Sequence, residues 1–201
     1  MPNLHAPSLI LASTSAYRRA LLERLAVPFT AEAPGVDEQR GADEAPADLA
    51  IRLATEKARA VAARHPRAVV IGSDQVATTP DGRILGKPGT VERAVEQLMA
   101  ASGRAVQFLT AVAVVRSDGE VETYTDCTTA VFRTLDEDEV RRYVLLDRPL
   151  DCAGSFRSEA LGAVLLERVD NQDPTALIGL PLVWLAGALR RAGIDPLRAR
   201  S

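Results

Sequence analysis

A hydroxyl-rich turn followed by two arginines carries the clearest chemical signal in this sequence. Ser13-Thr14-Ser15 comes directly after the apolar run Leu9-Ile10-Leu11-Ala12, and Arg18-Arg19 lie at the start of a helical pattern. The unpaired N–H groups of a helix N-terminus attract anions. Hydroxyl and guanidinium groups add charge-assisted hydrogen bonds. The order of these parts is typical of a polyphosphate site, although a capped helix with solvated arginines explains the same residues equally well.

Asp74 and Lys87 are two further charged residues that could belong to a phosphate-binding site. Asp74 follows the buried-strand pattern Val69-Val70-Ile71-Gly72, and ligands of open α/β sheets gather at the carboxyl ends of strands. There it could accept a proton from water, hold a divalent metal, or do both, whereas its alternative role is to cap a turn. Lys87, in Gly86-Lys87-Pro88, could meet a phosphate as a point charge or belong to a plain surface turn.

Three other candidates have an ordinary explanation when they are taken alone. Lys57 lies in a helical pattern, where solvated ion pairs with neighbouring charges account for it. Glu38 lies in a polar loop that could simply be solvated. Glu159 ends the turn-rich segment 152–159, whose small residues would let a flat ligand approach. In that segment Glu159 could accept hydrogen bonds from ring N–H groups, or it could belong to an exposed loop.

The scarcity of histidine limits the catalytic mechanisms that this sequence can support. The two histidines are His5, in the N-terminal tail, and His65, beside Pro66, and neither has a serine or cysteine partner nearby in the sequence. A Ser-His-Asp or Cys-His mechanism and a zinc site are therefore disfavoured. Carboxylates, lysine, arginine and a hard metal ion remain, and this is the usual set for attack at phosphorus.

Composition indicates one domain over residues 1–201 with an aliphatic core, because 47% of the residues are hydrophobic and only 4% are aromatic. The net charge is -3 and the basic residues are scattered, which argues against a nucleic-acid partner. The apolar run near the N-terminus is too short for a signal peptide, and no stretch approaches the roughly 20 apolar residues of a membrane span. We therefore expect a cytoplasmic protein with no membrane partner, in which Cys127 and Cys152 are free thiols.

Hydrophobic periodicity predicts an α/β fold with a mixed sheet, because strands and helices alternate early and long strands are adjacent in the middle. The helix over 48–64 should place Ile51, Leu53, Ala54, Ala58 and Val61 on one side. The middle strands and their turns could form the second lobe of a cleft. Strands are expected at 8–12, 29–33, 68–72, 106–115, 122–133 and 163–169, and helices at 16–26, 48–64, 91–101, from 136 to before Pro149, 174–179 and 181–192.

Taken in order, these motifs resemble the Maf family of nucleoside triphosphate pyrophosphatases over nearly the whole chain. The departure is Ala16, where the family usually has proline before its arginines. The matching pieces are Leu9–Ser15 with Arg18-Arg19, Val36-Asp37-Glu38, Leu53-Ala54 with Glu56-Lys57-Ala58, Gly72-Ser73-Asp74-Gln75, Gly86-Lys87-Pro88 and Gly179-Leu180-Pro181-Leu182. The resemblance implies a twisted mixed sheet flanked by helices, with two lobes around a central cleft, as in inosine-triphosphatase-like proteins.

The resemblance also implies an activity: hydrolysis of a nucleoside triphosphate to the monophosphate and pyrophosphate with a divalent cation, Mg²⁺ or Mn²⁺. Asp74 would accept the proton, and Glu38 would help to bind metal or to order water, so that both are candidate metal ligands. A homodimer is compatible with the resemblance. The residues implied to bind phosphates and to offset developing charge are Ser13, Arg18, Arg19, Lys57 and Lys87.

Substrate choice divides the family. Members acting on dTTP and UTP usually have threonine after the catalytic aspartate and arginine before the arginine pair, where this chain has Gln75 and Tyr17. Together with Gly154–Glu159, this pattern is similar to the branch that hydrolyses 7-methyl-GTP, with Tyr17, Gln75 and Glu159 as substrate-binding residues. Packing of Tyr17 on Leu21 is the structural alternative. The functional alternatives are the same reaction on dTTP, UTP or other modified nucleotides, and a nucleotide-sensing regulator of septum formation.

Overall fold

The structure, a computed structural model, describes residues 7–198, so His5 lies outside the described residues. The chain divides into two compact units. Unit 1 comprises residues up to Asp74, Thr110–Asp126 and Asp173 onward, and unit 2 comprises Gln75–Leu109 and Cys127–Gln172. The strands join in the order β2-β1-β3-β5-β6-β7, with β4 paired to β3. The sheet is mixed: β1 pairs in parallel with β2 and β3, while β4 and β7 pair antiparallel with β3 and β6.

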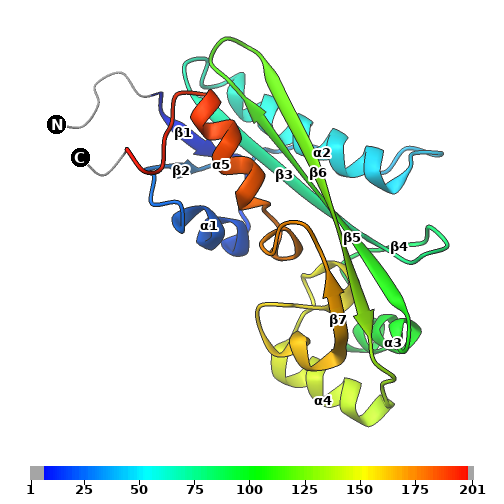
Figure 1. The fold of residues 1–201 in the computed structure, drawn as a ribbon. Coiled ribbons are helices and arrows are strands. Elements are labelled where there is room, and N and C mark those ends of the chain that lie inside the picture. The colour runs from blue at the N-terminus through cyan, green and yellow to red at the C-terminus, as the bar shows by residue number, and fades with distance from the viewer. Residues whose placement is uncertain (1–6, 199–201) are drawn as a thin grey trace. The chain divides into compact units, whose positions relative to one another are not determined.

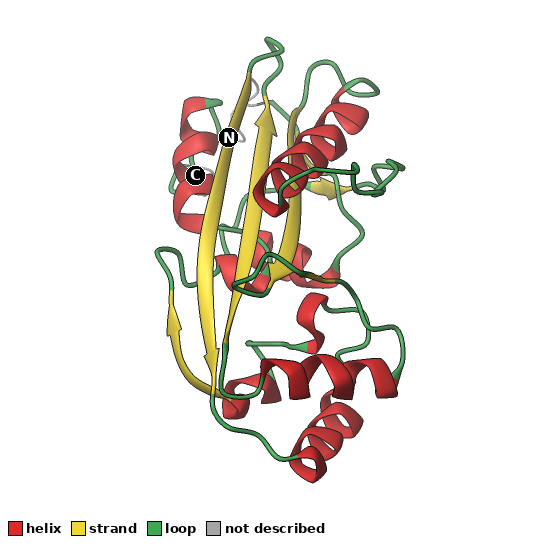
Figure 2. Ribbon diagram, turned by 90° about the vertical axis from the view of Figure 1, so that its right-hand side faces the viewer, coloured by secondary structure: helices red, strands yellow, loops and turns green. Residues whose placement is uncertain are grey.

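Unit 1 is a three-layer arrangement of helices on both faces of strands. Figure 2 shows α2 and α5 on opposite sides of the long strands, and Figure 1 labels these elements. Its helices are α1 (Ala16–Glu23), α2 (Pro46–Ala62) and α5 (Leu182–Arg191), with a 3₁₀ turn, η3, at Ala176–Ile178. Its strands are β1 (Leu9–Leu11), β2 (Thr30–Ala31) and the adjoining parts of β3 (Val69–Thr78), β5 (Ala105–Val115) and β6 (Val121–Phe132).

Side chains along the strands of unit 1 point alternately to the two faces of the sheet, and they pack against the helices on each face. Every second residue of β1, β3 and β5 packs in one cluster with leucines of α1 and α5: Leu9, Leu11, Val69, Ile71, Val112, Val114, Leu21, Leu22, Leu185 and Leu189. The intervening residues face α2, whose contact is closest at Gly72. A Cβ atom on Gly72 would lie 2.1 Å from the Ala54 carbonyl oxygen and 2.6 Å from the Ala58 nitrogen. Glycine at this position therefore lets α2 lie directly on β3.

Unit 2 carries the remaining helices and turns. Helices α3 and α4 pack against each other, and both begin at a side-chain cap. Thr90 accepts a hydrogen bond from the Arg93 N–H, and Asp136 from the Glu139 N–H. The elements are α3 (Val91–Ala101), α4 (Glu137–Asp147), β4 (Ile84–Leu85), β7 (Leu166–Asp170), the 3₁₀ turns η1 (Ala153–Ser155) and η2 (Leu161–Leu165), and the outer parts of β3, β5 and β6.

The predicted elements are largely confirmed, and the differences have local causes. The strand expected at 68–72 continues to Thr78, where its outer part pairs with β4, so Asp74 lies within the strand rather than at its end. The strand expected at 163–169 begins only at Leu166, because pairing with β6 starts at the Phe132–Leu166 contact and residues 161–165 form 3₁₀ turns. The helical piece expected at 174–179 is a single 3₁₀ turn, and Pro181 is the N-cap rather than the first residue of α5. Ile51 is 36% exposed, so its expected place on the buried side of α2 was wrong. Cys127 and Cys152 are free, as predicted.

None of the helices between residues 7 and 198 is both long and apolar enough to cross a membrane.

We predict that Gly72→Ala destabilises the protein by about 3 kcal/mol or more, because the added methyl group overlaps the backbone of α2. Chemical denaturation measures the change. Gly86→Ala is the matched control, since a Cβ atom there would have no neighbour within 4 Å and its effect should stay within about 1 kcal/mol. Equal losses for the two variants would show that α2 can move away from β3 at little cost.

Candidate active site

A buried lysine shared by two carboxylates lies at the centre of the candidate site. Lys57 Nζ donates to Asp74 Oδ1 at 2.6 Å and forms an ion pair with Glu38 Oε1, also at 2.6 Å. The lysine side chain is only 6% exposed and that of Asp74 12%, whereas Glu38 is largely open to solvent. The interpretation of Lys57 as a solvated surface residue, which the sequence alone allowed, is therefore wrong. Three predicted site residues from separate elements meet at one ammonium group.

The local folding of α2 and β3 explains why Lys57 and Asp74 meet. Lys57 lies on the buried face of α2, between Ala54 and Ala58. Those two residues are the ones against which Gly72 packs. Asp74 lies two residues after Gly72 on β3, so alternation along the strand directs both to the same face. The close approach of α2 to Gly72 thus brings the lysine against the carboxylate.

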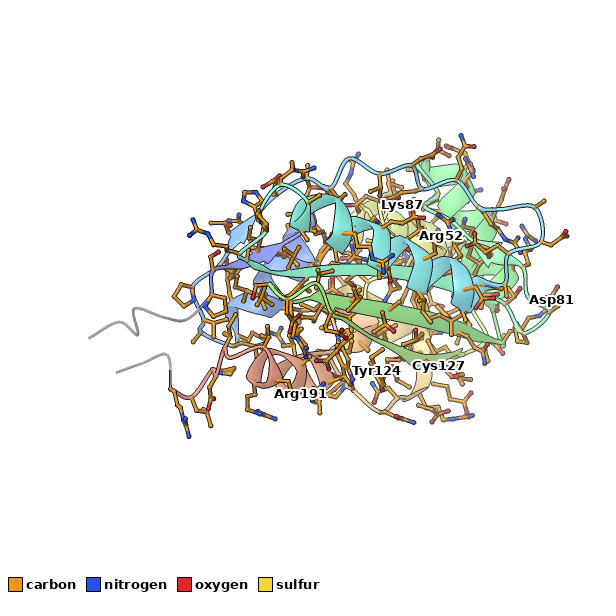
Figure 3. The ribbon with its side chains drawn as sticks, turned by 90° about the horizontal axis from the view of Figure 1, so that it is seen from above. Arg52, Asp81, Lys87, Tyr124, Cys127 and Arg191 are labelled. Carbon is orange, nitrogen blue, oxygen red and sulfur yellow. The ribbon has the colours of Figure 1, made fainter. Side chains whose placement is uncertain are left out.

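Glu38 reaches the same lysine from an irregular loop that is fastened to α2. Arg52, a residue of α2 labelled in Figure 3, binds Glu44 through Nε at 2.6 Å and a terminal nitrogen at 2.9 Å. It also donates to the Gln39 carbonyl oxygen at 3.0 Å, one residue after Glu38. The loop is closed on itself, because the Gly41 N–H donates to Glu44 Oε2. Sequence reasoning missed Arg52, which the chain offers only as one more charged helix residue.

The turn before α1 forms the second part of the site. Ser15 is the N-cap of α1 and accepts from the Arg18 N–H, while the buried Ser13 Oγ accepts from the Ser15 N–H. Arg18 Nε donates to the Gly179 carbonyl oxygen at 3.0 Å. Within residues 7–198 its two terminal nitrogens make no hydrogen bond. Arg19 is exposed and its side chain likewise has no ionic partner in this range.

Charge around Arg18 favours an anion at this place. Burial lowers the pKa of the Arg18 guanidinium, and the negative charges of Asp74 and Glu38 act in the opposite direction. The arginine nevertheless stays cationic at neutral pH, because a guanidinium group is not deprotonated in proteins. Arg18, Lys57, Asp74 and Glu38 carry two charges of each sign. Arg19 adds one positive charge, which suits an anionic guest.

Three of the other predicted site residues, Gln75, Lys87 and Glu159, lie in unit 2. Lys87 and Glu159 are exposed, and Gln75 is half-buried in β3 as the first residue of the unit. Phe156, in the segment before Glu159, is a core residue that packs on Phe108 and Phe132. The structure thus assigns a packing role to part of this segment and leaves Glu159 on the surface. Tyr17 lies in α1 of unit 1 and is half-buried.

Ser73 is a further polar residue of the site that the sequence did not single out. Its hydroxyl is fully buried and lies 2.8 Å from the Ala111 carbonyl oxygen and 3.0 Å from that of Gly179. Gly179 therefore accepts from Ser73 as well as from Arg18. Only its position inside the motif Gly72-Ser73-Asp74-Gln75 could have drawn attention to Ser73.

The donor set near Lys57 suits a hard cation. No group of three or more histidine, cysteine or acidic side chains within residues 7–198 has the arrangement of a metal site. Mg²⁺, however, is commonly held by one or two carboxylates together with water and substrate phosphates. Glu38 and Asp74 approach a single point, occupied by Lys57 Nζ, and supply that kind of ligand.

Comparison with known proteins identifies close relatives. Residues 8–192 match a family model described as Maf-like protein. The chain is 56% identical over 187 residues to a 7-methyl-GTP pyrophosphatase of Aromatoleum aromaticum, covering 92% of this chain and 96% of that protein. It is 55% identical over 192 residues to a 7-methyl-GTP pyrophosphatase of Bordetella pertussis, covering 95% of each. A solved structure of the Staphylococcus aureus Ham1 protein aligns with 16% identity and a TM-score of 0.45, covering 62% of this chain and 71% of that one.

We predict that Glu44 titrates far below an ordinary glutamate. Hydrogen bonds from Arg52 lower the pKa of Glu44 to about 2, although desolvation opposes the shift. Because the folded-state pKa is depressed, this attachment of the loop is complete above the unfolded value of about 4.5 and is lost as the pH falls toward 2. Carboxylate NMR over that pH range measures it.

Arg52→Gln should return the pKa of Glu44 toward its ordinary value and speed exchange of the Gly41 amide. Arg59→Gln, an exchange of the same kind later in the same helix, is the matched control and should change neither. A wild-type Glu44 that titrates near 4.5 would contradict the attachment of the loop through Arg52.

Proposed function

We propose that this chain, which belongs to the Maf family, is a nucleoside triphosphate pyrophosphatase whose substrate is 7-methyl-GTP. The products would be the nucleoside monophosphate and pyrophosphate. The observation that carries the proposal is the convergence of Glu38, Lys57 and Asp74 within electrostatic range of Arg18, whose terminal nitrogens make no hydrogen bond within residues 7–198. Relatives at 50–56% identity that carry the name 7-methyl-GTP pyrophosphatase support the substrate.

The turn before α1 would bind the phosphate chain. The Arg18 guanidinium presents planar N–H groups that match phosphate oxygens in pairs. Arg19, the Ser13 hydroxyl and the N-terminus of α1 would add further donors at the same end of β1. These groups are preset by the fold, so they would offset the charge that develops on the departing pyrophosphate without reorganising.

Asp74 would be the general base. One of its carboxylate oxygens accepts from Lys57, and the other makes no hydrogen bond within residues 7–198, which leaves a lone pair for water. As the water oxygen bonds to phosphorus, its proton would pass to Asp74 and the bond to the bridging oxygen would break, releasing pyrophosphate. Lys57 would hold Asp74 and Glu38 beside each other, where Glu38 would orient the water.

A divalent cation fits this arrangement, with Glu38 and Asp74 as the protein ligands. When bound, it would neutralise charge on the phosphate oxygens. Within unit 2, Lys87 is proposed as a phosphate-binding residue and Gln75 and Glu159 as substrate-binding residues. Within unit 1, Tyr17 is proposed as a further substrate-binding residue. We place the enzyme in the cytoplasm and keep a homodimer as part of the proposal.

Two alternatives are tested by the same measurements. In one, the reaction is the same but the substrate is dTTP, UTP or another modified nucleotide. In the other, the protein senses a nucleotide to regulate septum formation and any hydrolysis is incidental. Asp74 favours an enzyme, since a sensor needs cations around the phosphates but has no need of a buried carboxylate base.

We predict that Asp74→Asn lowers kcat by about 10²–10⁴-fold while nucleotide binding stays nearly unchanged, because the amide cannot accept the proton. Pyrophosphate release measures turnover, and calorimetry measures binding. Asp48→Asn, in the exposed first turn of α2, is the matched control and should keep full activity. Persistent turnover in Asp74→Asn would remove Asp74 from the role of base.

The substrate is tested with a panel of nucleoside triphosphates in Mg²⁺ or Mn²⁺, again by following pyrophosphate release. 7-Methyl-GTP should give the highest kcat/KM. A preference for dTTP or UTP would support the first alternative. Tight binding of a nucleotide with no pyrophosphate release by the wild-type protein would support the sensor.

We further predict that Tyr17→Ala raises KM for 7-methyl-GTP about tenfold, near 1.4 kcal/mol. Methylation at N7 makes guanine cationic, and an aromatic face gains about 0.5–2 kcal/mol from a cation. Tyr17→Phe, which keeps the ring, is the matched control, and GTP is the matched substrate without the charge. An unchanged KM in Tyr17→Ala, with Glu159→Ala also silent, would place the base elsewhere.

A further inference from the structure

The loop before α5 does more than end a run of apolar residues. The sequence suggests that Gly179-Leu180-Pro181 is a kink that seats the last helix. In the structure, the Gly179 carbonyl oxygen accepts from Arg18 Nε at 3.0 Å and lies 3.0 Å from the Ser73 hydroxyl. A carbonyl oxygen has two lone pairs, so it can accept from both. The loop therefore contacts two residues beside the candidate site.

The Gly179 contact sets the orientation of the Arg18 side chain. It is the one side-chain hydrogen bond that Arg18 makes within residues 7–198. Because a guanidinium group is planar, fixing the Nε–H direction also fixes the plane of the two terminal amino groups. Gly179 has a φ of +127°, and a Cβ atom there would lie 3.5 Å from Arg18 Nε. Glycine thus gives the carbonyl a backbone conformation that other residues rarely adopt.

Thr175 holds the residues on either side of Pro181. Its hydroxyl oxygen accepts from the Leu182 N–H at 2.9 Å and lies 2.9 Å from the Leu180 carbonyl oxygen. It is itself oriented by Asp173, whose Oδ1 atom lies 2.6 Å from the Thr175 hydroxyl. Asp173 Oδ2 accepts from the Val183 N–H at 2.7 Å, so the pair also caps a helix whose N-cap residue, Pro181, offers no side-chain hydrogen bond.

The chain of contacts runs from a buried carboxylate to the phosphate-binding arginine. Asp173 is 3% exposed, and its carboxylate accepts hydrogen bonds from two backbone N–H groups and one hydroxyl group. Thr175 contacts the loop by accepting from the Leu182 N–H, and its single hydroxyl proton lies between Asp173 Oδ1 and the Leu180 carbonyl oxygen. A change at Thr175 therefore displaces Leu180, and Gly179 is bonded directly to Leu180.

We propose that Thr175 is a positioning residue for catalysis: through the loop 179–182 it fixes the Gly179 carbonyl group, which aims the Arg18 guanidinium at the substrate phosphates. This rests on the proposed function, which makes Arg18 a phosphate ligand. Asp173 is the second member of the device, because it orients the Thr175 hydroxyl. The effect belongs to binding of the phosphate chain rather than to proton transfer.

The test compares Thr175→Val with Thr175→Ser, since valine keeps the shape and loses the hydroxyl while serine keeps the hydroxyl. We expect Thr175→Val to raise KM about tenfold with kcat within about threefold, and Thr175→Ser to restore KM. The Arg18 Nε–H signal in ¹H–¹⁵N NMR provides a readout that needs no turnover. Its exchange with water should accelerate on the order of tenfold in Thr175→Val and return to the wild-type rate in Thr175→Ser.

Thr90→Val is the matched control, because it removes the same kind of hydroxyl cap from α3 in unit 2. It should lower the melting temperature and leave the Arg18 signal and KM unchanged. If Thr175→Val fails to fold, Gly179→Ala replaces it and should give the same loss of protection at Arg18. A protected Arg18 signal and an unchanged KM in the folded variant would overturn the proposal. Loss of protection in a protein whose wild type releases no pyrophosphate would overturn the proposed function alone.

Discussion

The ammonium group of Lys57, buried and shared between Asp74 and Glu38, is the interaction on which the candidate site depends. Removing one partner of a buried ion pair costs about 3–5 kcal/mol, because the remaining charge is left in a poorly solvated place. This cost applies to Asp74, the buried partner from β3, whereas Glu38 is a second, solvent-exposed partner from a loop. Glycine at position 72 makes the contact between Lys57 and Asp74 possible, since it alone lets α2 approach the strand closely enough.

Two backbone segments without regular structure are held by side chains that do not touch the reacting groups. Arg52 fastens the loop that carries Glu38, and Thr175 with Asp173 fastens the loop that carries Gly179. Arg52 binds the carbonyl group of Gln39, which is the residue after Glu38. Thr175 contacts the carbonyl group of Leu180, which is the residue after Gly179. Irregular loops can thus be as well positioned as strands, provided that their backbone carbonyl and N–H groups have fixed partners.

Most of the elements were predictable because the periodicity of the chain is strong. The caps at Thr90 and Asp136 and the long strands β5 and β6 follow from residue type and alternation alone. The start of the strand expected at 163–169 was not predictable in this way, because its pairing depends on the register of β6. Ile51 was misplaced for a related reason: an apolar residue on a helix is buried only if another element covers it.

The sequence by itself indicated the type of chemistry, because its motifs supply carboxylates, lysines and arginines, and neither histidine lies in a sequence pattern typical of a Ser-His-Asp or Cys-His mechanism. It also singled out Asp74, but it placed this residue at the end of a strand, whereas β3 continues to Thr78. Only the tertiary structure decided that Lys57 is buried against Asp74 and Glu38 rather than solvated, and that the Gly179 carbonyl group orients Arg18. These contacts join residues 17 to 161 positions apart, and local sequence patterns carry no information about distances between separate elements.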